Sequence, residues 1–425
     1  MSSTLMSLGT LQYLLQYMDA NRRFEISNRC PSLREFEKSV PLRIDSLEFM
    51  KHLVTINDTT YQVGIIRKYN IGEAPELVKW DNKTGGVRYE VDKYGIEDLS
   101  DAKTRTPGDI KMKGRTMFEN RRFQDENINR TLLENRIQNS EAHIAQLLER
   151  RPNANVAQFR NDIEANRAKL FAYDCRRDNI PPNYEHFVQI TTWKLAEFWE
   201  QKAFERYHHN KKYSEAVKQL AKVLFGGRNC PIHVKEMEFK CRKGIIRLPV
   251  DVKFRVERLE FHAPVEKTLQ ELAPIIHESS YPLKQIAIHS PTNENFNHPI
   301  VRAAGRLKVR MAFISNLDVL LSLPNPRVHV RAAIIPNTFE TIIGNWIESN
   351  RPIGTEYIFD FGNLALFMDV MEDFWKSLNG VPIDDENMVF PMNDAARLKI
   401  SYGTFQEFAP RSKYAVRFFT EAIEN

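Results

Sequence analysis

The 425-residue sequence contains few cysteines and no long apolar segment. Its four cysteines, Cys30, Cys175, Cys230 and Cys241, are widely scattered, which favours a reduced intracellular protein over a disulfide-stabilised secreted one. No apolar run approaches the ~18 residues of a membrane-spanning helix, and the N-terminus does not have the pattern of a secretory signal peptide. We therefore expect a protein of the cytoplasm or nucleus with no membrane contact.

Motifs for nucleotide binding, metal binding and covalent catalysis are also scarce. Gly226-Gly227-Arg228 is too short for a phosphate-binding loop, because no Gly-Lys-Ser or Gly-Lys-Thr follows it. His277 begins His-Glu-Ser-Ser, which has no second histidine for a zinc-protease helix. Cys230, His233 and Cys241 do not have the spacing of a zinc site and are expected to be structural.

Other polar groups suggest no chemistry either. His208-His209 is expected at a solvated corner, and Asp384-Asp385-Glu386 in a solvated loop. The sequence thus predicts no catalytic residue, no cofactor and no metal. A pocket in which His, Asp or Cys side chains converge would instead indicate an enzyme.

The formal net charge of +5 is concentrated in one segment. Residues 103–122 contain seven Lys or Arg and two acidic residues. Clustered basic side chains can contact phosphates, so a nucleic-acid-binding arm is one interpretation. Pro107, Gly108 and Gly114 favour the other interpretation, a solvated linker. We prefer the linker, because no recognised RNA- or DNA-binding module lies on either side.

The first forty residues carry three short apolar helix patterns. Leucines recur at steps of three and four over residues 8–18, which predicts an amphipathic helix. Asp19 is placed to cap a second helix that ends before Pro31, and Leu33 begins a third pattern that runs to Val40. Three short helices cannot bury their own apolar faces. They are expected to pack on the following domain or on a partner protein.

After residue 41 the pattern changes to the alternation typical of strands. Residues 54–56 and 60–66 flank Asn57-Asp58, which predicts a hairpin with its turn at that pair. Gly85-Gly86 precedes an alternating strand over 87–91. Residues 124–225 are mostly helical by spacing, with helices indicated over about 128–147, 156–170, 187–199 and 217–224.

The C-terminal region alternates strand-like and helix-like runs. Ile288, Val309 and Val330 lie 21 residues apart, and Ile358 and Ile400 follow after 28 and 42 more. A strand and a helix every ~20–29 residues is the period of leucine-rich repeats, although the full consensus is missing. We predict a degenerate repeat-like stack with strands parallel along one face and helices over 339–347 and 364–374. An ordinary α/β domain with chance spacing is the alternative.

The predicted fold class is therefore α+β. The regions are a small N-terminal unit of helices and a β-hairpin (1–102), a basic linker (103–123), a helical region (124–229) and a leucine-rich-repeat-like α/β stack (230–425).

Several unusual segments resemble one family. Residues 18–41 (MDANRRFEISNRCPSLREFEKSVP), 56–61, 85–95 and 224–228 are similar, in order, to segments of nematode F-box C-type proteins. They match that group's shared domain of unknown function, which would cover most of residues 8–315. Residues 338–347 (TFETIIGNWI) are similar to the helix of nematode F-box-associated repeats.

This resemblance implies a non-catalytic adaptor. F-box proteins bind the Skp-type adaptor of a cullin-RING (SCF-type) ubiquitin ligase through N-terminal helices, and their C-terminal domain holds a protein substrate. On this basis the partner-binding residues would be Leu11, Leu14, Leu15, Ile26, Pro31 and Leu33. The alternatives are that these side chains pack on the following hairpin, and that the protein is an interaction scaffold without ligase contact.

Overall fold

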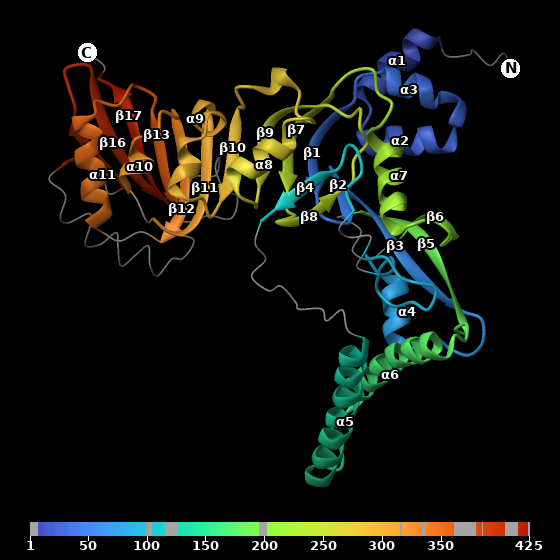
Figure 1. Ribbon diagram of the computed structural model, residues 1–425. Coiled ribbons are helices and arrows are strands. Elements are labelled where there is room, and N and C mark those ends of the chain that lie inside the picture. Colours follow the sequence, from blue (N-terminus) through green and yellow to red (C-terminus); the bar gives the residue numbers. More distant parts are fainter. Residues whose placement is uncertain are drawn as a thin grey trace. The chain divides into compact units, whose positions relative to one another are not determined.

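A computed structural model of the chain describes residues 7–98, 100, 104–114, 126–194, 202–314, 317–333, 337–360, 380–384, 386–403 and 415–423 (Figure 1). The contacts divide the chain into two compact units. Unit 1 contains residues 1–111, 115–232 and 243–252, and unit 2 contains residues 112–114, 233–242 and 253–425.

Unit 1 combines an antiparallel sheet with helices before, between and after its strands. The helices are α1 (Leu8–Tyr17), α2 (Ala20–Arg29), the 3-10 turn η1 (Pro31–Leu33), α3 (Arg34–Ser39), α4 (Glu76–Lys83), α5 (Glu126–Arg150), α6 (Ala157–Asp178) and α7 (Tyr213–Phe225). The strands β1 (Arg43–Phe49), β2 (Leu53–Ile56), β3 (Thr59–Tyr69), β5 (Tyr184–Lys194) and β6 (Lys202–His208) are paired in the order β1-β2-β3-β5-β6. The short strand β8 (Lys243–Ile246) also belongs to unit 1, and β4 (Ile110–Lys113) begins in unit 1 and ends in unit 2.

The predicted N-terminal helices, the cap of the second helix and the first hairpin are confirmed. Three short helices occupy residues 8–39, and the carboxylate of Asp19 accepts hydrogen bonds from the amides of Asn21 and Arg22 at 2.9 and 3.3 Å, which caps α2. The predicted hairpin is β2–β3. Its turn residue Asn57 has φ of 53°, a left-handed conformation that Asn adopts more readily than most residues.

Three local predictions in unit 1 are wrong. Residues 184–194 form β5 rather than a helix, because all eleven pair with the long strand β3. Residues 87 and 91 make only isolated bridges instead of a strand. Within the basic segment, residues 110–113 form β4, and Asp109 beside it is 2% exposed, so this part is not a solvated linker.

Unit 2 is a run of parallel strands with helices between them, followed by an antiparallel end. Its elements are β7 (Ile232–Phe239), β9 (Phe254–Phe261), α8 (Val265–Leu272), η3 (Glu278–Ser280), β10 (Gln285–His289), η4 (Asn293–Asn297), α9 (Pro299–Ala303), β11 (Arg306–Phe313), α10 (Leu317–Leu321), β12 (Arg327–Ala333), α11 (Asn337–Glu348), β13 (Glu356–Asp360), β14 (Val381–Pro382), β15 (Asn387–Pro391), β16 (Ala396–Gly403) and β17 (Ala415–Ala422). The strand order is β14-β15-β16-β17-β13-β12-β11-β10-β9-β7.

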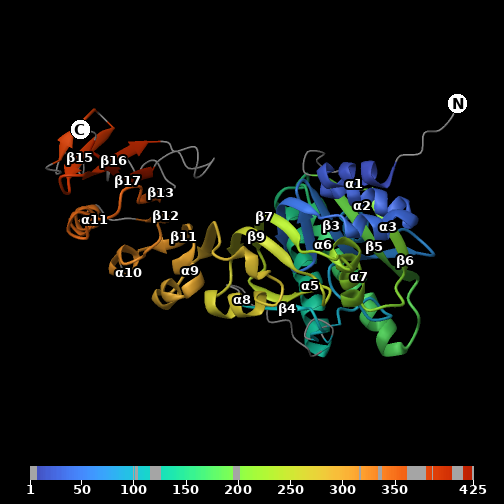
Figure 2. The ribbon, with the colours of Figure 1, turned by 90° about the horizontal axis from the view of Figure 1, so that it is seen from above.

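The 21-residue spacing is a strand register. Ile288 of β10 pairs with Val309 of β11, and Val309 pairs with Val330 of β12. The next step is one residue longer than predicted, because Val330 pairs with Phe359 and not with Ile358. Helices α8 to α11 lie along one face of these strands (Figure 2), so the apolar side chains of this face are buried and the polar side chains lie on the outer face.

The parallel arrangement holds from β9 to β13 and ends there. Strand β17 pairs with β13 in the antiparallel sense, and β16, β15 and β14 continue antiparallel. Trp346 of α11 contacts both strands at this junction between β13 and β17. Its indole donates a 2.8 Å hydrogen bond to the Thr420 hydroxyl of β17, and its ring meets Tyr357 of β13 edge-on at 5.0 Å. The helix predicted over 364–374 lies outside the described residues. No helix that is long and apolar enough to cross a membrane occurs among the described residues.

Candidate functional site

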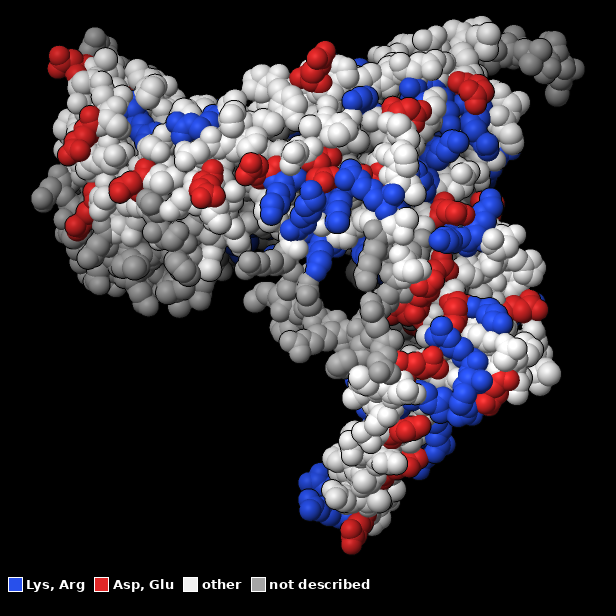
Figure 3. Space-filling view, viewed as in Figure 1, with Lys and Arg blue, Asp and Glu red and all other residues white. Residues whose placement is uncertain are grey.

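Helix α1 presents an uncharged apolar face to solvent. Its ten residues, LGTLQYLLQY, contain no Asp, Glu, Lys or Arg, and the molecular surface over it is free of charge (Figure 3). Tyr13, Leu14 and Tyr17 are 65%, 43% and 71% exposed, although large apolar side chains normally avoid water. The two tyrosine rings lie 4.9 Å apart, so they form one continuous patch. We call Tyr13, Leu14 and Tyr17 the α1 patch.

The six predicted partner-binding residues do not share one environment. Leu14 and Pro31 are exposed, Leu11, Ile26 and Leu33 are half-buried, and Leu15 is buried at 2% exposure. Leu15 faces the unit's own interior, so it is unable to contact a partner without unfolding α1. Tyr13 and Tyr17 belong to the exposed surface instead. The spacing of the leucines predicts the apolar face of the helix, and Tyr13 and Tyr17 lie outside that spacing, so the sequence pattern did not identify them.

A set of hydrogen bonds fixes α2 to the hairpin turn. The second oxygen of Asp19 accepts from the Asn57 amide at 2.8 Å, in addition to capping the helix. Asn21 donates to the Ile56 carbonyl at 3.0 Å and accepts from the Tyr61 hydroxyl at 3.0 Å. We call these contacts the α2–hairpin clasp. The helices are therefore anchored within unit 1, while the α1 patch remains outside the anchored surface.

A buried triad of Arg23, Glu37 and Arg228 connects the N-terminal helices to the end of α7. The Glu37 carboxylate lies 2.7 Å from an Arg23 nitrogen and 3.1 Å from an Arg228 nitrogen, and all three side chains are at most 3% exposed. Arg23 also donates to the carbonyls of Glu37, Val40 and Pro41. Gly226-Gly227-Arg228 thus has a packing role, and Gly227 has φ of 68°.

Two cations share one carboxylate in this triad. Burial lowers the pKa of Arg23 and of Arg228, and the charge of Glu37 opposes that shift. Among the described residues, two nitrogens of Arg228, Nε and Nη1, have no hydrogen-bond partner. The Arg228 guanidinium lies 6.0 Å from the centre of the Phe24 ring, which supplies a weak cation–π contact.

Unit 1 contains a hollow of ≈ 880 Å³ between α4, α5, α6 and residues of the segment 89–98. Cations such as Arg67 and Lys169 line it together with carboxylates such as Asp81. Burial lowers the pKa of Lys169 and raises the pKa of Asp81. A lining of mixed charge does not select a ligand of one sign.

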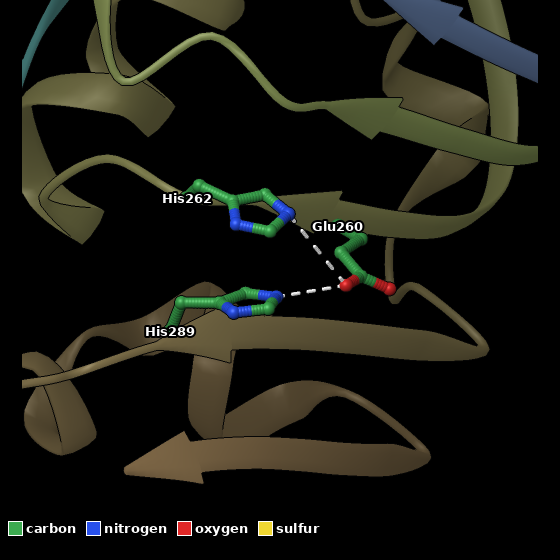
Figure 4. A group of neighbouring side chains, drawn as sticks. All are labelled: Glu260, His262 and His289. Atoms are coloured by element: carbon green, nitrogen blue, oxygen red, sulfur yellow. Dashed lines mark hydrogen bonds and ion pairs between the residues drawn. The ribbon is translucent and has the colours of Figure 1, made fainter. Parts of the chain in front are cut away.

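Unit 2 brings two histidines and a glutamate together on its outer sheet face. Glu260 lies in β9, His262 directly follows β9, and His289 ends β10. The Glu260 carboxylate oxygen lies 2.8 Å from Nε2 of His289 and 4.0 Å from Nε2 of His262 (Figure 4). The imidazole rings are stacked, with centres 3.7 Å apart. We call Glu260, His262 and His289 the His–Glu cluster.

Further charged groups surround the His–Glu cluster. Glu238 of β7 places a carboxylate oxygen 3.1 Å from Nε2 of His262. Burial opposes ionisation of Glu260, but hydrogen bonding and charge from His289 lower the pKa of its carboxyl group below the ordinary value. Lys308 and Arg310 lie on the neighbouring strand β11, where Arg310 pairs with His289. Burial lowers the pKa of Lys308, against the opposing effect of the Glu260 charge.

The histidines and cysteines considered from sequence do not join this cluster. Cys230 belongs to unit 1, whereas His233 and Cys241 belong to unit 2. His208 is exposed, as expected, but His209 is not simply solvated, because its Nε2 lies 2.8 Å from the buried Glu90 carboxylate. Among the described residues, the His–Glu cluster is the group whose ligand atoms lie close enough for one metal ion.

The comparisons with known proteins identify one domain. Residues 212–363 match the family described as "Domain of unknown function (DUF3557)". The match contains the His–Glu cluster and the segments 224–228 and 338–347, whereas α1, the clasp and residues 85–95 lie outside it. Neither the curated proteins nor the solved structures contain a significant match. The chain therefore contains a DUF3557 domain that spans α7 to β13.

Proposed function

We propose that the protein is a non-catalytic protein-binding adaptor, similar to the substrate-recognition subunit of a cullin-RING ubiquitin ligase. The α1 patch would contact the Skp-type adaptor, and the outer sheet face of unit 2 would hold a protein target. The protein would act in the cytoplasm or nucleus, where such ligases work. The single observation that carries the proposal is an uncharged helix whose large apolar side chains are exposed.

The size of α1 determines how it would bind. Ten helical residues span ~15 Å. Helix α1 alone is therefore too short to supply the ~800 Å² per partner that a standard interface buries. The α1 patch would therefore form the apolar centre of the contact, where a few aromatic and aliphatic residues supply most of the binding free energy. Exposed polar residues of α2, such as Arg22 and Arg29, would form the rim.

The decisive experiment is co-purification of the full-length protein with the Skp-type adaptor. Leu14→Asp combined with Tyr17→Asp should weaken capture at least about tenfold, because a charge placed in an apolar contact costs more than ~1.4 kcal/mol. Ile71→Asp is the matched control, since Ile71 is 76% exposed on unit 1 and lies in the segment after β3 rather than in α1. If the wild-type protein captures no adaptor, the ligase function is wrong.

The target surface can be tested separately. Arg310 and Arg331 are exposed on the outer face of β11 and β12, opposite the face that α8 to α11 cover. Replacing both by Glu should remove bound target proteins and leave adaptor capture intact. Targets that remain bound to this variant would contradict the assignment of the outer face.

An interaction scaffold without ligase contact is the second candidate. The specific observation in its favour is that Leu15 is buried and Leu11, Ile26 and Leu33 are half-buried, so most of the predicted contact residues serve the unit's own packing. Retained target binding together with no adaptor capture would support this candidate.

A further inference from the structure

We propose that Glu260, His262 and His289 bind one divalent transition-metal ion, with zinc as the best-suited metal. This site is independent of the adaptor function, and its test does not depend on a partner protein.

The positions of the donor atoms carry the inference. One nitrogen of His262, one nitrogen of His289 and one oxygen of Glu260 all lie within 4.8 Å of one another. A tetrahedral zinc ion with bonds of ~2.0–2.1 Å holds its ligand atoms ~3.3–3.4 Å apart, so small side-chain rotations suffice. Both histidines direct a nitrogen toward the same Glu260 oxygen (Figure 4), as ligands of one ion must converge.

The strand register explains why the three ligands stay together. Leu259 pairs with Ile286 and Phe261 pairs with Ile288, so the residues after Phe261 and Ile288, His262 and His289, follow at adjacent positions. Glu260 projects from the same strand two residues before His262. The backbone of two parallel strands therefore holds the ligand set, and a rigid scaffold lowers the entropy lost when an ion binds.

The chemistry of the donors suits zinc. Two imidazoles and one carboxylate form the three-ligand set of catalytic zinc sites, which leave a fourth position for water or substrate. Imidazole binds a metal in its neutral form.

The local charges allow a divalent cation. Glu238 and Glu260 together can offset the charge of one such ion, and the Glu238 carboxylate lies 3.1 Å from the same His262 nitrogen that faces Glu260. Lys308 and Arg310 oppose cation binding from the neighbouring strand, and a water-derived or other anionic fourth ligand would reduce that repulsion. His289 also lines an open hollow of ≈ 300 Å³ together with Ser290, Arg310, Met311 and Arg331, which gives an ion access from solvent.

Cobalt and zinc titrations of the full-length, chelator-treated protein test the site. We expect one Co²⁺ ion per chain, visible absorption typical of a tetrahedral nitrogen and oxygen site, and displacement by Zn²⁺. His262→Ala and His289→Ala should each weaken affinity more than about 100-fold, since even a supporting residue is worth about 10–100-fold. Zn²⁺ should also raise the Tm of the wild-type protein and not that of these variants.

The controls separate this site from others. His277→Ala, in unit 2 but outside the His–Glu cluster, should bind metal as the wild type does. Glu260→Gln preserves shape and is the second variant if an alanine variant fails to fold by circular dichroism. A thiolate-to-cobalt charge-transfer band would place the ion at a cysteine, and that result, unchanged affinity in the cluster variants, or no binding by the wild type would overturn the proposal.

Discussion

Glu37 and Arg228 are 191 positions apart in sequence, yet both oxygens of the Glu37 carboxylate accept hydrogen bonds of 3.1 Å from one Arg228 nitrogen. Glu37 comes from the short helix α3, and Arg228 follows the Gly-Gly pair after α7. Two segments that are far apart in the sequence, 18–41 and 224–228, thus meet inside unit 1. Their unusual residues serve to hold the unit together.

Removal of Glu37 should destabilise unit 1 strongly. Glu37→Ala leaves Arg23 and Arg228 buried without a counter-charge, which costs about 3–5 kcal/mol of unfolding free energy in comparable buried pairs. Urea unfolding followed by circular dichroism measures this loss. Glu35→Ala, at an exposed position of the same helix, should change stability by less than about 0.5 kcal/mol.

A variant with all three triad residues replaced by apolar ones of similar size should recover part of the stability lost in Glu37→Ala, because no buried charge then remains while the carbonyls of Val40 and Pro41 lose their Arg23 donor. Equal losses in Glu35→Ala and Glu37→Ala would show that the triad contributes nothing to folding.

Substitutions at Asp19 should separate helix capping from the clasp. Asp19→Ala loses both the cap of α2 and the bond to Asn57, so we expect a loss of more than about 1 kcal/mol. Asp19→Asn retains a capping oxygen but places its side-chain amide against the Asn57 amide. It should therefore lower the free energy of unfolding less than Asp19→Ala does. Thermal unfolding of the two variants gives the comparison, and a loss in Asp19→Asn as large as that in Asp19→Ala would rule out a contribution from the cap.

The register of the parallel strands predicts which isoleucines matter in unit 2. Ile288 is 1% exposed on the helix-covered face, so Ile288→Ala should cost about 2–5 kcal/mol through lost burial and the cavity left behind. Ile353 is 57% exposed in the loop before β13, and Ile353→Ala should have little effect. Denaturant midpoints compare the two, and similar midpoints would contradict the assigned inner face.

His329 should make unit 2 sensitive to acid. Burial lowers the pKa of this histidine from 6.5 to about 4, despite the nearby Asp360 charge. Between these values the unfolded chain binds a proton that the folded chain does not, so stability falls as the pH decreases from 6.5 to about 4, by up to about 3 kcal/mol.

His329→Gln removes the titrating group. Its urea midpoint should therefore fall less than that of the wild type between about pH 7 and about pH 4.5. His143→Gln, an exposed position of α5, is the control and should follow the wild type. An unchanged pH profile in His329→Gln would assign the acid sensitivity to other groups.

The sequence predicted the features that depend on nearby residues. The cap at Asp19, the turn at Asn57 and the helix boundaries before β1 follow from local hydrogen bonding and backbone preference. The spacing of Ile288, Val309 and Val330 predicted the parallel register because each connecting segment between these strands has the same length.

Features that depend on distant partners were not predicted. Phe187, Ile190 and Trp193 have helix-like spacing, but pairing with β3 determines the strand, and the β-branched residues between them are consistent with it. Neither of the two segments that form the triad has a sequence pattern that predicts their contact. The His–Glu cluster could have been predicted from strand register, because the register that pairs Leu259 with Ile286 also places His262 beside His289.

Strand β17 determines how this architecture can vary among related chains. Since β17 runs against β13 and occupies its free edge, duplication of another strand–helix unit cannot lengthen the stack at that end. A longer relative would have to insert its extra unit between β9 and β13, where every neighbouring pair of strands runs in the same direction. Such an insertion would widen the outer face and leave the Trp346–Thr420 junction unchanged.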